Sequence, residues 1–200
     1  MRLVRLKGGE EAGRSPRPAQ QEREGRARTP RSDRPPVSPE TLMRMATHYL
    51  GRYSASTARL REVLARKIRR RCELRDLPQP DEAATRALID DVVGRLARTG
   101  LIDDAAYGRG RAAALARKGW PAWRIRGDLQ RQGVDLEQGG VAEATDVDEK
   151  AQATRLAERK RLGPYRPGAR EPYRDRDIRS LVRAGFPVSM AKAVVDGEAG

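Results

Sequence analysis

The sequence predicts an all-α protein: three tandem three-helix repeats, similar to helix-turn-helix units, that form an elongated, curved molecule behind a disordered basic N-terminal tail. Three observations carry this prediction. One helix-ending pattern occurs four times, and apolar residues recur at helical spacing between these endings. In addition, only 38% of the 200 residues are hydrophobic and 4% are aromatic. That composition favours small helical modules over one large core.

The helix-ending pattern is Leu-x-Arg-x-Gly followed by an apolar residue, at positions 96–101, 115–120, 129–134 and 181–186. Glycine adopts the left-handed conformation after a helix, which lets the next amide bond back to the last turn. The apolar residue then packs on the helix, and the arginine complements the negative end of the helix dipole. The pattern therefore predicts an alternation of helices and tight turns.

The first 37 residues have a different composition. They are rich in Arg, Pro, Gly, Ser, Gln and Glu, and almost no large apolar residue follows Leu6. Such a segment cannot bury enough apolar surface to offset the entropy lost on ordering, so we expect a disordered tail over residues 1–37. Its composition leaves two roles open: loose binding of nucleic acid, or a solvated segment with no dedicated partner.

Serine and aspartate mark the starts of the predicted helices, because their side chains accept hydrogen bonds from free amides of the first turn. The three repeats then span residues 38–100, 101–147 and 148–200. The predicted caps are Ser38, Ser54 or Ser56, Asp81, Asp103 or Asp104, Asp148, and Asp175 or Asp177.

Two segments depart from the regular pattern. Where the second helix of the first repeat should have its glycine, the chain has Ile68, so we expect this helix to continue until Pro78. In the second repeat, Asp135 is expected to cap a weak third helix. Gly139 and Gly140 would each cost about 1 kcal/mol in its interior, which predicts fraying.

Packing and flexibility are predicted at two further places. The helix that follows Asp103 and Asp104 is expected to allow close approach of a neighbour at Tyr107, Gly110, Ala113 and Ala114. The segment 163–172 is rich in proline and is expected to be a flexible loop.

Charge and cysteine content limit the class of protein. The net charge of +14 predicts anionic partners, of which nucleic acid is the first candidate and a membrane surface the second. Cys72 is the only cysteine, which excludes an internal disulfide and any multi-cysteine zinc site. The chain has no apolar run long enough to span a bilayer and no signal peptide, so we expect a cytoplasmic protein.

Two groups of basic residues are the candidate contact surface. Arginine forms forked hydrogen bonds with phosphate or carboxylate, so such groups suit an anionic partner. The alternative is that they are only solvated faces and helix-end charges. The first group is Arg66, Lys67, Arg69, Arg70 and Arg71, and the second is Arg109, Arg117, Lys118, Arg124, Arg126 and Arg131.

The two tryptophans suggest stacking on bases, but Trp120 occupies the apolar position after a glycine and is expected in the core, whereas Trp123 stays open. Catalysis has little support. His48 is the single histidine, and the aspartate pairs at 90–91 and 103–104 lack partners at metal-ligand spacing. We expect no enzyme activity, metal or cofactor.

Together these motifs resemble the RecX family of bacterial regulatory proteins over about residues 40 to 196. The resemblance is most specific between Gly100 and Asp135. A weaker match covers His48 to Lys67. In the third repeat, the resemblance covers Arg176 to Phe186. The residues that form the repeat signature are Leu101, Ile102, Asp103, Asp104, Tyr107, Gly119, Trp120, Ile125, Leu129, Gly133, Val134, Leu181, Gly185 and Phe186.

The resemblance implies three tandem three-helix modules and a non-enzymatic, monomeric regulator. Such a protein would lie in the groove of the RecA filament on single-stranded DNA and inhibit strand exchange, ATP hydrolysis and coprotease activity. It would thereby modulate DNA repair and the SOS response. Binding to single-stranded DNA is expected to be weak and independent of sequence.

A second hypothesis is a DNA-binding transcriptional regulator with helix-turn-helix geometry, in which Arg124 and Arg126 lie on the recognition helix. Recurrence of the same unit along the chain favours the first hypothesis, because a repressor normally needs one such unit and a dimer interface.

Overall fold

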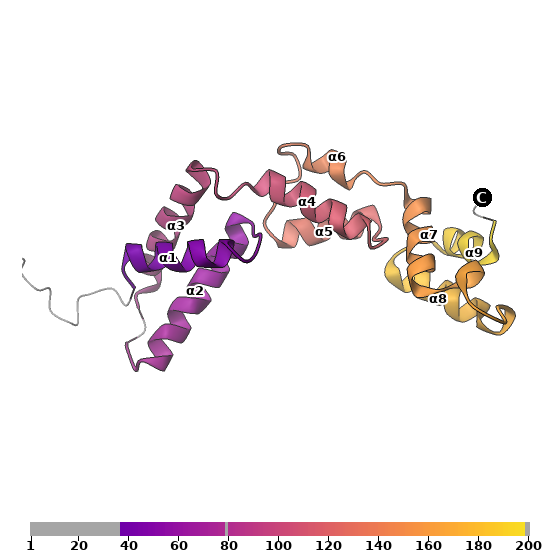
Figure 1. The fold of residues 1–200 in the computed structure, drawn as a ribbon, viewed down its shortest axis with the longest axis horizontal. Helices are drawn as coiled ribbons and strands as arrows, with labels where there is room; N and C mark the ends of the chain where they lie inside the picture. The colour runs from indigo at the N-terminus through magenta and orange to yellow at the C-terminus, as the bar shows by residue number, and fades with distance from the viewer. Residues whose placement is uncertain (1–36, 79, 199–200) are drawn as a thin grey trace, which may run out of the picture. The chain divides into compact units, whose positions relative to one another are not determined.

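A computed structural model describes residues 37–78 and 80–198, and every regular element within these ranges is helical, which confirms the all-α class (Figure 1). The predicted tail, apart from Val37, lies outside the described residues. The α-helices are α1 (Pro39–Leu50), α2 (Thr57–Leu74), α3 (Glu82–Arg98), α4 (Asp104–Ala116), α5 (Ala122–Arg131), α6 (Val141–Thr145), α7 (Glu149–Lys160), α8 (Arg174–Ala184) and α9 (Val188–Asp196). Two short 3₁₀ helices are η1 (Gly163–Tyr165) and η2 (Glu171–Tyr173).

The described residues bury their apolar side chains in three separate clusters. The first lies among α1, α2 and α3, the second among α4, α5 and α6, and the third among α7, α8 and α9. We call these three helix groups. Val37, which the sequence placed in the tail, and Ile102, which it placed in the second repeat, are both buried in the first cluster. The repeat boundaries themselves stay predictions.

The four glycine endings are confirmed. Gly100, Gly119, Gly133 and Gly185 all have positive φ, between 70° and 106°. At each one, the amide of the following residue bonds to the carbonyl of the pattern's leucine at 3.0 to 3.3 Å, which is the Schellman arrangement. The expected apolar contact fails at one ending, since Leu101 is 56% exposed.

The end of α2 corrects the sequence prediction. This helix passes Ile68, as expected, but it ends at Leu74 before Pro78 is reached. Asp76 has φ of +49°, and the Leu77 amide bonds to the Cys72 carbonyl at 3.0 Å. Aspartate tolerates the left-handed conformation better than most residues, so it replaces the glycine of the other endings.

Several predicted helix starts are confirmed. The Ser38, Ser56, Asp81, Asp103 and Asp148 side chains each accept a hydrogen bond from an amide of the first turn. Their local sequence was sufficient to identify them, because a cap bonds to an amide only two or three residues away.

Four other local predictions are wrong. The Asp135 side chain accepts a bond from the Glu137 amide, and α6 starts only after Gly140, whose φ is +73°. Helix α8 begins at Arg174, before either predicted aspartate. The segment 163–172 was expected to be a loop but contains η1 and the start of η2.

The fourth error concerns close packing along α4. A Cβ at Gly110 would meet nothing within 4 Å, whereas a Cβ at Gly108 would lie 2.8 Å from Val134 Cγ1 and 3.0 Å from Val141 Cγ2. Gly108 is therefore the position of closest approach. Gly108 and Gly110 lie on different faces of the helix, and only the tertiary fold decides which face is covered.

The helix groups meet through two junctions of similar construction. At the first junction, the end of α5 lies against the start of α2: the Ser56 hydroxyl donates to the Gln132 carbonyl, and Gly133 contacts Ala58. At the second, the end of α8 lies against the start of α5, where Gly185 contacts Trp123. In both cases a Cβ on the glycine would collide with the second residue of the facing helix.

Each junction also has an acidic residue that caps a helix of the preceding group. The Asp104 carboxylate accepts from the Thr57 amide at 2.7 Å and from the Thr57 hydroxyl at 2.6 Å. The Glu149 carboxylate accepts from the Ala122 amide at 2.8 Å. Both acids occupy the first position of their own helix, and both donors occupy the first position of the capped helix. Asp104 was one of two residues predicted to cap α4. It caps α2 instead, and Asp103 caps α4.

Asp104→Ala is expected to lower the free energy of unfolding by about 1 to 2 kcal/mol, because it removes a helix cap and leaves Thr57 unpaired. Urea unfolding of the full chain measures this change. A double-mutant cycle with Thr57→Ala should show a coupling of at least about 0.5 kcal/mol. Additive effects of the two substitutions would contradict the inter-group cap.

Candidate binding surfaces

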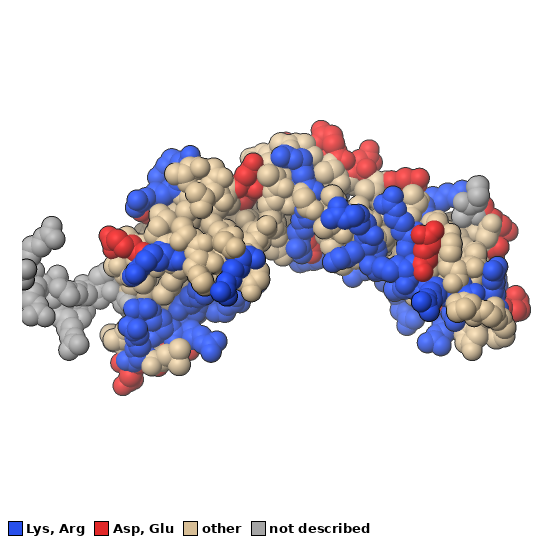
Figure 2. Space-filling view, viewed as in Figure 1, with Lys and Arg blue, Asp and Glu red and all other residues tan. Residues whose placement is uncertain are grey.

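Helix α2 presents the more accessible of the two basic groups. Its apolar stripe packs into the first cluster, and the opposite face carries the cations. Arg66, Lys67, Arg69 and Arg70 are all exposed, and none forms an ion pair with another described residue. Arg71 is half-buried. Figure 2 shows the Lys and Arg side chains gathered over α2. The four exposed cations are therefore available to an anionic partner.

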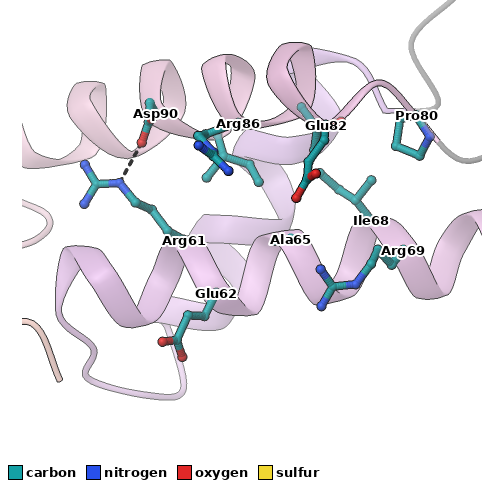
Figure 3. Close-up of a pocket in the computed structure, with 11 residues that line it drawn as sticks. Arg61, Glu62, Ala65, Ile68, Arg69, Pro80, Glu82, Arg86 and Asp90 are labelled. Carbon is teal, nitrogen blue, oxygen red and sulfur yellow. Dashed lines mark hydrogen bonds and ion pairs between the residues drawn. The ribbon is translucent and has the colours of Figure 1, made fainter. Parts of the chain in front are cut away.

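A groove of about 530 Å³ lies between α2 and α3, beside this basic face (Figure 3). Ala65, Ile68 and Ile89 supply apolar surface to it. Arginines and acids alternate among the other lining residues, and Arg61 Nε lies 2.7 Å from Asp90 Oδ1. The balance of charges makes the groove less suitable for phosphate than the four cations of α2.

The second basic group is largely engaged within the chain. Arg117 and Lys118 are exposed at the end of α4 and have no ion pair among the described residues. Arg109 donates to the Gly139 carbonyl, and Arg131 lies 3.7 Å from the Asp128 carboxylate. These two arginines retain exposed surface, but part of their hydrogen-bonding capacity is already used.

Arg124 and Arg126, also in the second basic group, each contact another residue of the chain. Arg124 is half-buried, and its guanidinium carbon lies 4.1 Å from the centre of the Trp120 ring. Arg126 is exposed, but its Nε donates to the Thr145 hydroxyl at 3.1 Å. The spacing of apolar residues in α5 identified its buried face. It does not predict that Arg124 stacks on an aromatic ring or that Arg126 bonds to a residue of α6.

An ion pair that the sequence did not reveal joins α4 to α5. Arg111 donates through Nε and Nη2 to the two carboxylate oxygens of Asp128, which is buried. This hydrogen bonding raises the pKa of the Arg111 guanidinium above its usual value. The two residues are 17 positions apart on different helices, so no local pattern could have paired them.

The tryptophans have different environments. Trp120 is half-buried and packs against the second cluster, which confirms its predicted core position. Trp123 is 59% exposed, and its indole N–H donates to the Gly185 carbonyl at 3.1 Å. The ring is therefore accessible and held in one orientation.

Most residues of the predicted repeat signature are structural. They end helices, cap them or fill the three clusters, and Leu101 is the exception because it is exposed. The buried apolar members are Ile102, Ile125, Leu129, Val134, Leu181 and Phe186, while Tyr107 is half-buried against the second cluster.

His48 lies exposed in the last turn of α1. Across residues 37–78 and 80–198, no group of three or more His, Cys, Asp or Glu side chains is arranged to hold a metal ion. Within the same ranges, none of the helices has the length and apolar character that crossing a membrane requires.

Comparison with known proteins finds three relatives, all called Regulatory protein RecX. The protein from Myxococcus xanthus (strain DK1622) is 38% identical over 165 residues, which cover 80% of this chain and 87% of that protein. The protein from Pseudomonas savastanoi pv. phaseolicola (strain 1448A / Race 6) is 32% identical over 143 residues, 70% of this chain and 88% of that protein. The Serratia proteamaculans (strain 568) protein is 34% identical over 85 residues. No protein-family model and no solved structure matches the chain.

Proposed function

Because this chain belongs to the RecX family of regulatory proteins, we propose that it is a non-enzymatic regulator of the recombinase RecA. It binds RecA and RecA–DNA filaments as a monomer and inhibits the recombinase, ATPase and coprotease activities. Through this inhibition it modulates DNA repair and the SOS response in the cytoplasm. Single-stranded DNA is a secondary partner, bound weakly and without sequence preference.

The observation that carries this proposal is the row of four exposed cations on α2. A filament on single-stranded DNA presents phosphates and the carboxylates of its subunits, and guanidinium groups bind both. Arg66, Lys67, Arg69 and Arg70 are already exposed and have no ion-pair partner among the described residues, so binding does not require other ion pairs to break. The neighbouring groove between α2 and α3 offers apolar surface to a side chain of the recombinase.

The test is the single-stranded-DNA-dependent ATPase rate of the cognate RecA, titrated with this protein at fixed salt. The rate is expected to fall. For Arg66→Glu with Arg70→Glu, half-inhibition should need at least about tenfold more protein, because a hydrogen bond to a charged group contributes about 1.5 to 3 kcal/mol.

A matched control is Arg155→Glu with Arg159→Glu. These two exposed arginines lie four residues apart on α7, as Arg66 and Arg70 do on α2, and the double substitution changes the net charge by the same amount. The control variant should inhibit almost as well as the unmodified chain. An equal loss of inhibition in both double variants would show that only the net charge matters. If saturating amounts of the unmodified chain leave the ATPase rate unchanged, the proposed function is refuted.

The helix-turn-helix regulator receives less support. One of its two proposed base contacts, Arg124, is half-buried and stacks on Trp120. A protected footprint on a defined duplex would favour it, whereas salt-sensitive binding that ignores sequence would favour the RecA regulator.

A further inference from the structure

The two junctions between helix groups provide an internal comparison. At one, Ala58 is the second residue of α2 and contacts Gly133, which follows α5. At the other, Trp123 is the second residue of α5 and contacts Gly185, which follows α8. The Cβ of Ala58 makes the first contact, whereas the second is made by one edge of the indole, through Cζ2, Cε2 and Nε1. The junction therefore uses one edge of the Trp123 ring, and the side chain remains 59% exposed.

The remaining aromatic surface is both accessible and fixed. Trp123 is 59% exposed, its indole N–H is bonded to the Gly185 carbonyl, and a Cβ on Gly185 would collide with the ring. Trp120 differs because it is half-buried and Arg124 stacks on it. An exposed ring held in one orientation loses little conformational entropy when a flat ligand stacks on it.

Cations accompany this ring. Arg126 follows Trp123 by three residues, so both lie on one side of α5, and the bond to Thr145 fixes the position of its guanidinium. Arg183 is exposed in the last turn of α8, two residues before Gly185, and has no ion pair among the described residues. Figure 2 shows Lys and Arg gathered over α5, whereas Asp and Glu gather near α6.

We propose that Trp123 is a stacking platform for one base of a single-stranded nucleic acid, and that Arg126 and Arg183 bind the neighbouring phosphates. An aromatic ring beside guanidinium groups matches the two components of such a strand, the flat base and the anionic backbone. This inference deepens the proposed function and rests on it only for the source of the strand, the DNA within the filament. A protein side chain packing on Trp123 is the competing explanation.

The experiment measures fluorescence anisotropy of a labelled oligothymidylate titrated with the full chain. Trp123→Ala should raise the dissociation constant at least about fivefold, the lower limit for a base stacked on an aromatic ring. Trp123→Phe, which keeps a ring, should retain most of the affinity. Inorganic polyphosphate, which has charge but no bases, should bind the unmodified chain and Trp123→Ala equally well.

The control is Leu101→Ala, which removes another exposed apolar side chain, 56% exposed at the end of a different helix. It should bind like the unmodified chain. A second measurement uses Trp120→Phe, which leaves Trp123 as the single tryptophan of the chain. Its fluorescence should be quenched by oligothymidylate and not by polyphosphate.

Three results would overturn the inference. The first is an unchanged oligothymidylate affinity in a folded Trp123→Ala protein, and the second is an equal loss of polyphosphate binding in that variant. The third is a Trp123→Ala protein that inhibits the RecA ATPase less well but still binds oligothymidylate normally, which would assign Trp123 to a protein contact. If the unmodified chain fails to inhibit RecA but the stacking results hold, the proposed function fails and the base platform stands.

Discussion

Gly119→Ala is expected to lower the free energy of unfolding by about 3 kcal/mol or more, because two costs add at this position. Gly119 has φ of +71°, where an L side chain is strained by about 1 to 2 kcal/mol. An added Cβ would also lie 2.7 Å from the Leu156 amide nitrogen and 2.8 Å from the Gln152 carbonyl oxygen. Both contacts are with the backbone of α7, and such overpacking costs about 1 to 3 kcal/mol. Urea unfolding measures the sum.

Two other glycines separate these costs. Gly100 has φ of +72°, but its Cβ would meet nothing within 4 Å, so Gly100→Ala should show only the strain, about 1 to 2 kcal/mol. Gly110 is helical and open, so Gly110→Ala should stabilise the protein by about 0.5 to 1 kcal/mol. Equal losses at Gly119 and Gly100 would contradict the close approach of α4 to α7.

Asp177→Ala is expected to cost about 3 kcal/mol of unfolding free energy. Asp177 is 1% exposed and accepts the buried Gly163 amide at 2.9 Å together with two guanidinium bonds from Arg166. Removal of the carboxylate leaves a buried donor and a partly covered cation without their acceptor, and losses of this kind are among the largest for single substitutions. Urea unfolding of the full chain gives the value.

The adjacent Asp175 is the control for this experiment. Asp175 is exposed, and its Oδ1 lies 3.8 Å from Nη1 of Arg174. Asp175→Ala should change the unfolding free energy by no more than about 0.5 kcal/mol, as is usual for surface substitutions. A similar loss in both variants would show that the burial of Asp177 contributes nothing.

Local chemistry explains which parts of the fold were predictable. The four Schellman endings and the five confirmed caps involve donors and acceptors within five residues of one another, so the sequence pattern contains both partners. The failures arose where a neighbouring element decided the outcome. Gly108 rather than Gly110 faces the closest helix contact, and Leu101 has no apolar surface to cover it.

The same distinction between local and tertiary contacts applies to the candidate binding surfaces. The exposure of the four cations on α2 follows from the position of its apolar stripe, which helical spacing reveals. The partner of Arg126 did not follow, because Thr145 lies on another helix. The contacts of Arg131 with Asp128 and of Arg124 with Trp120 join residues only three and four positions apart. The pairing of Asp104 with Thr57 joins residues 47 positions apart.

By itself the sequence therefore determined the all-helical class, the main helix endings, most of the caps and the resemblance to a regulatory family. These features depend on backbone conformation and on hydrogen bonds between near neighbours. Tertiary structure alone decided which acids cap a helix in another group, which residue binds Arg126, and that Trp123 is exposed. Those outcomes depend on contacts between helices distant in sequence, whose partners only close packing brings together.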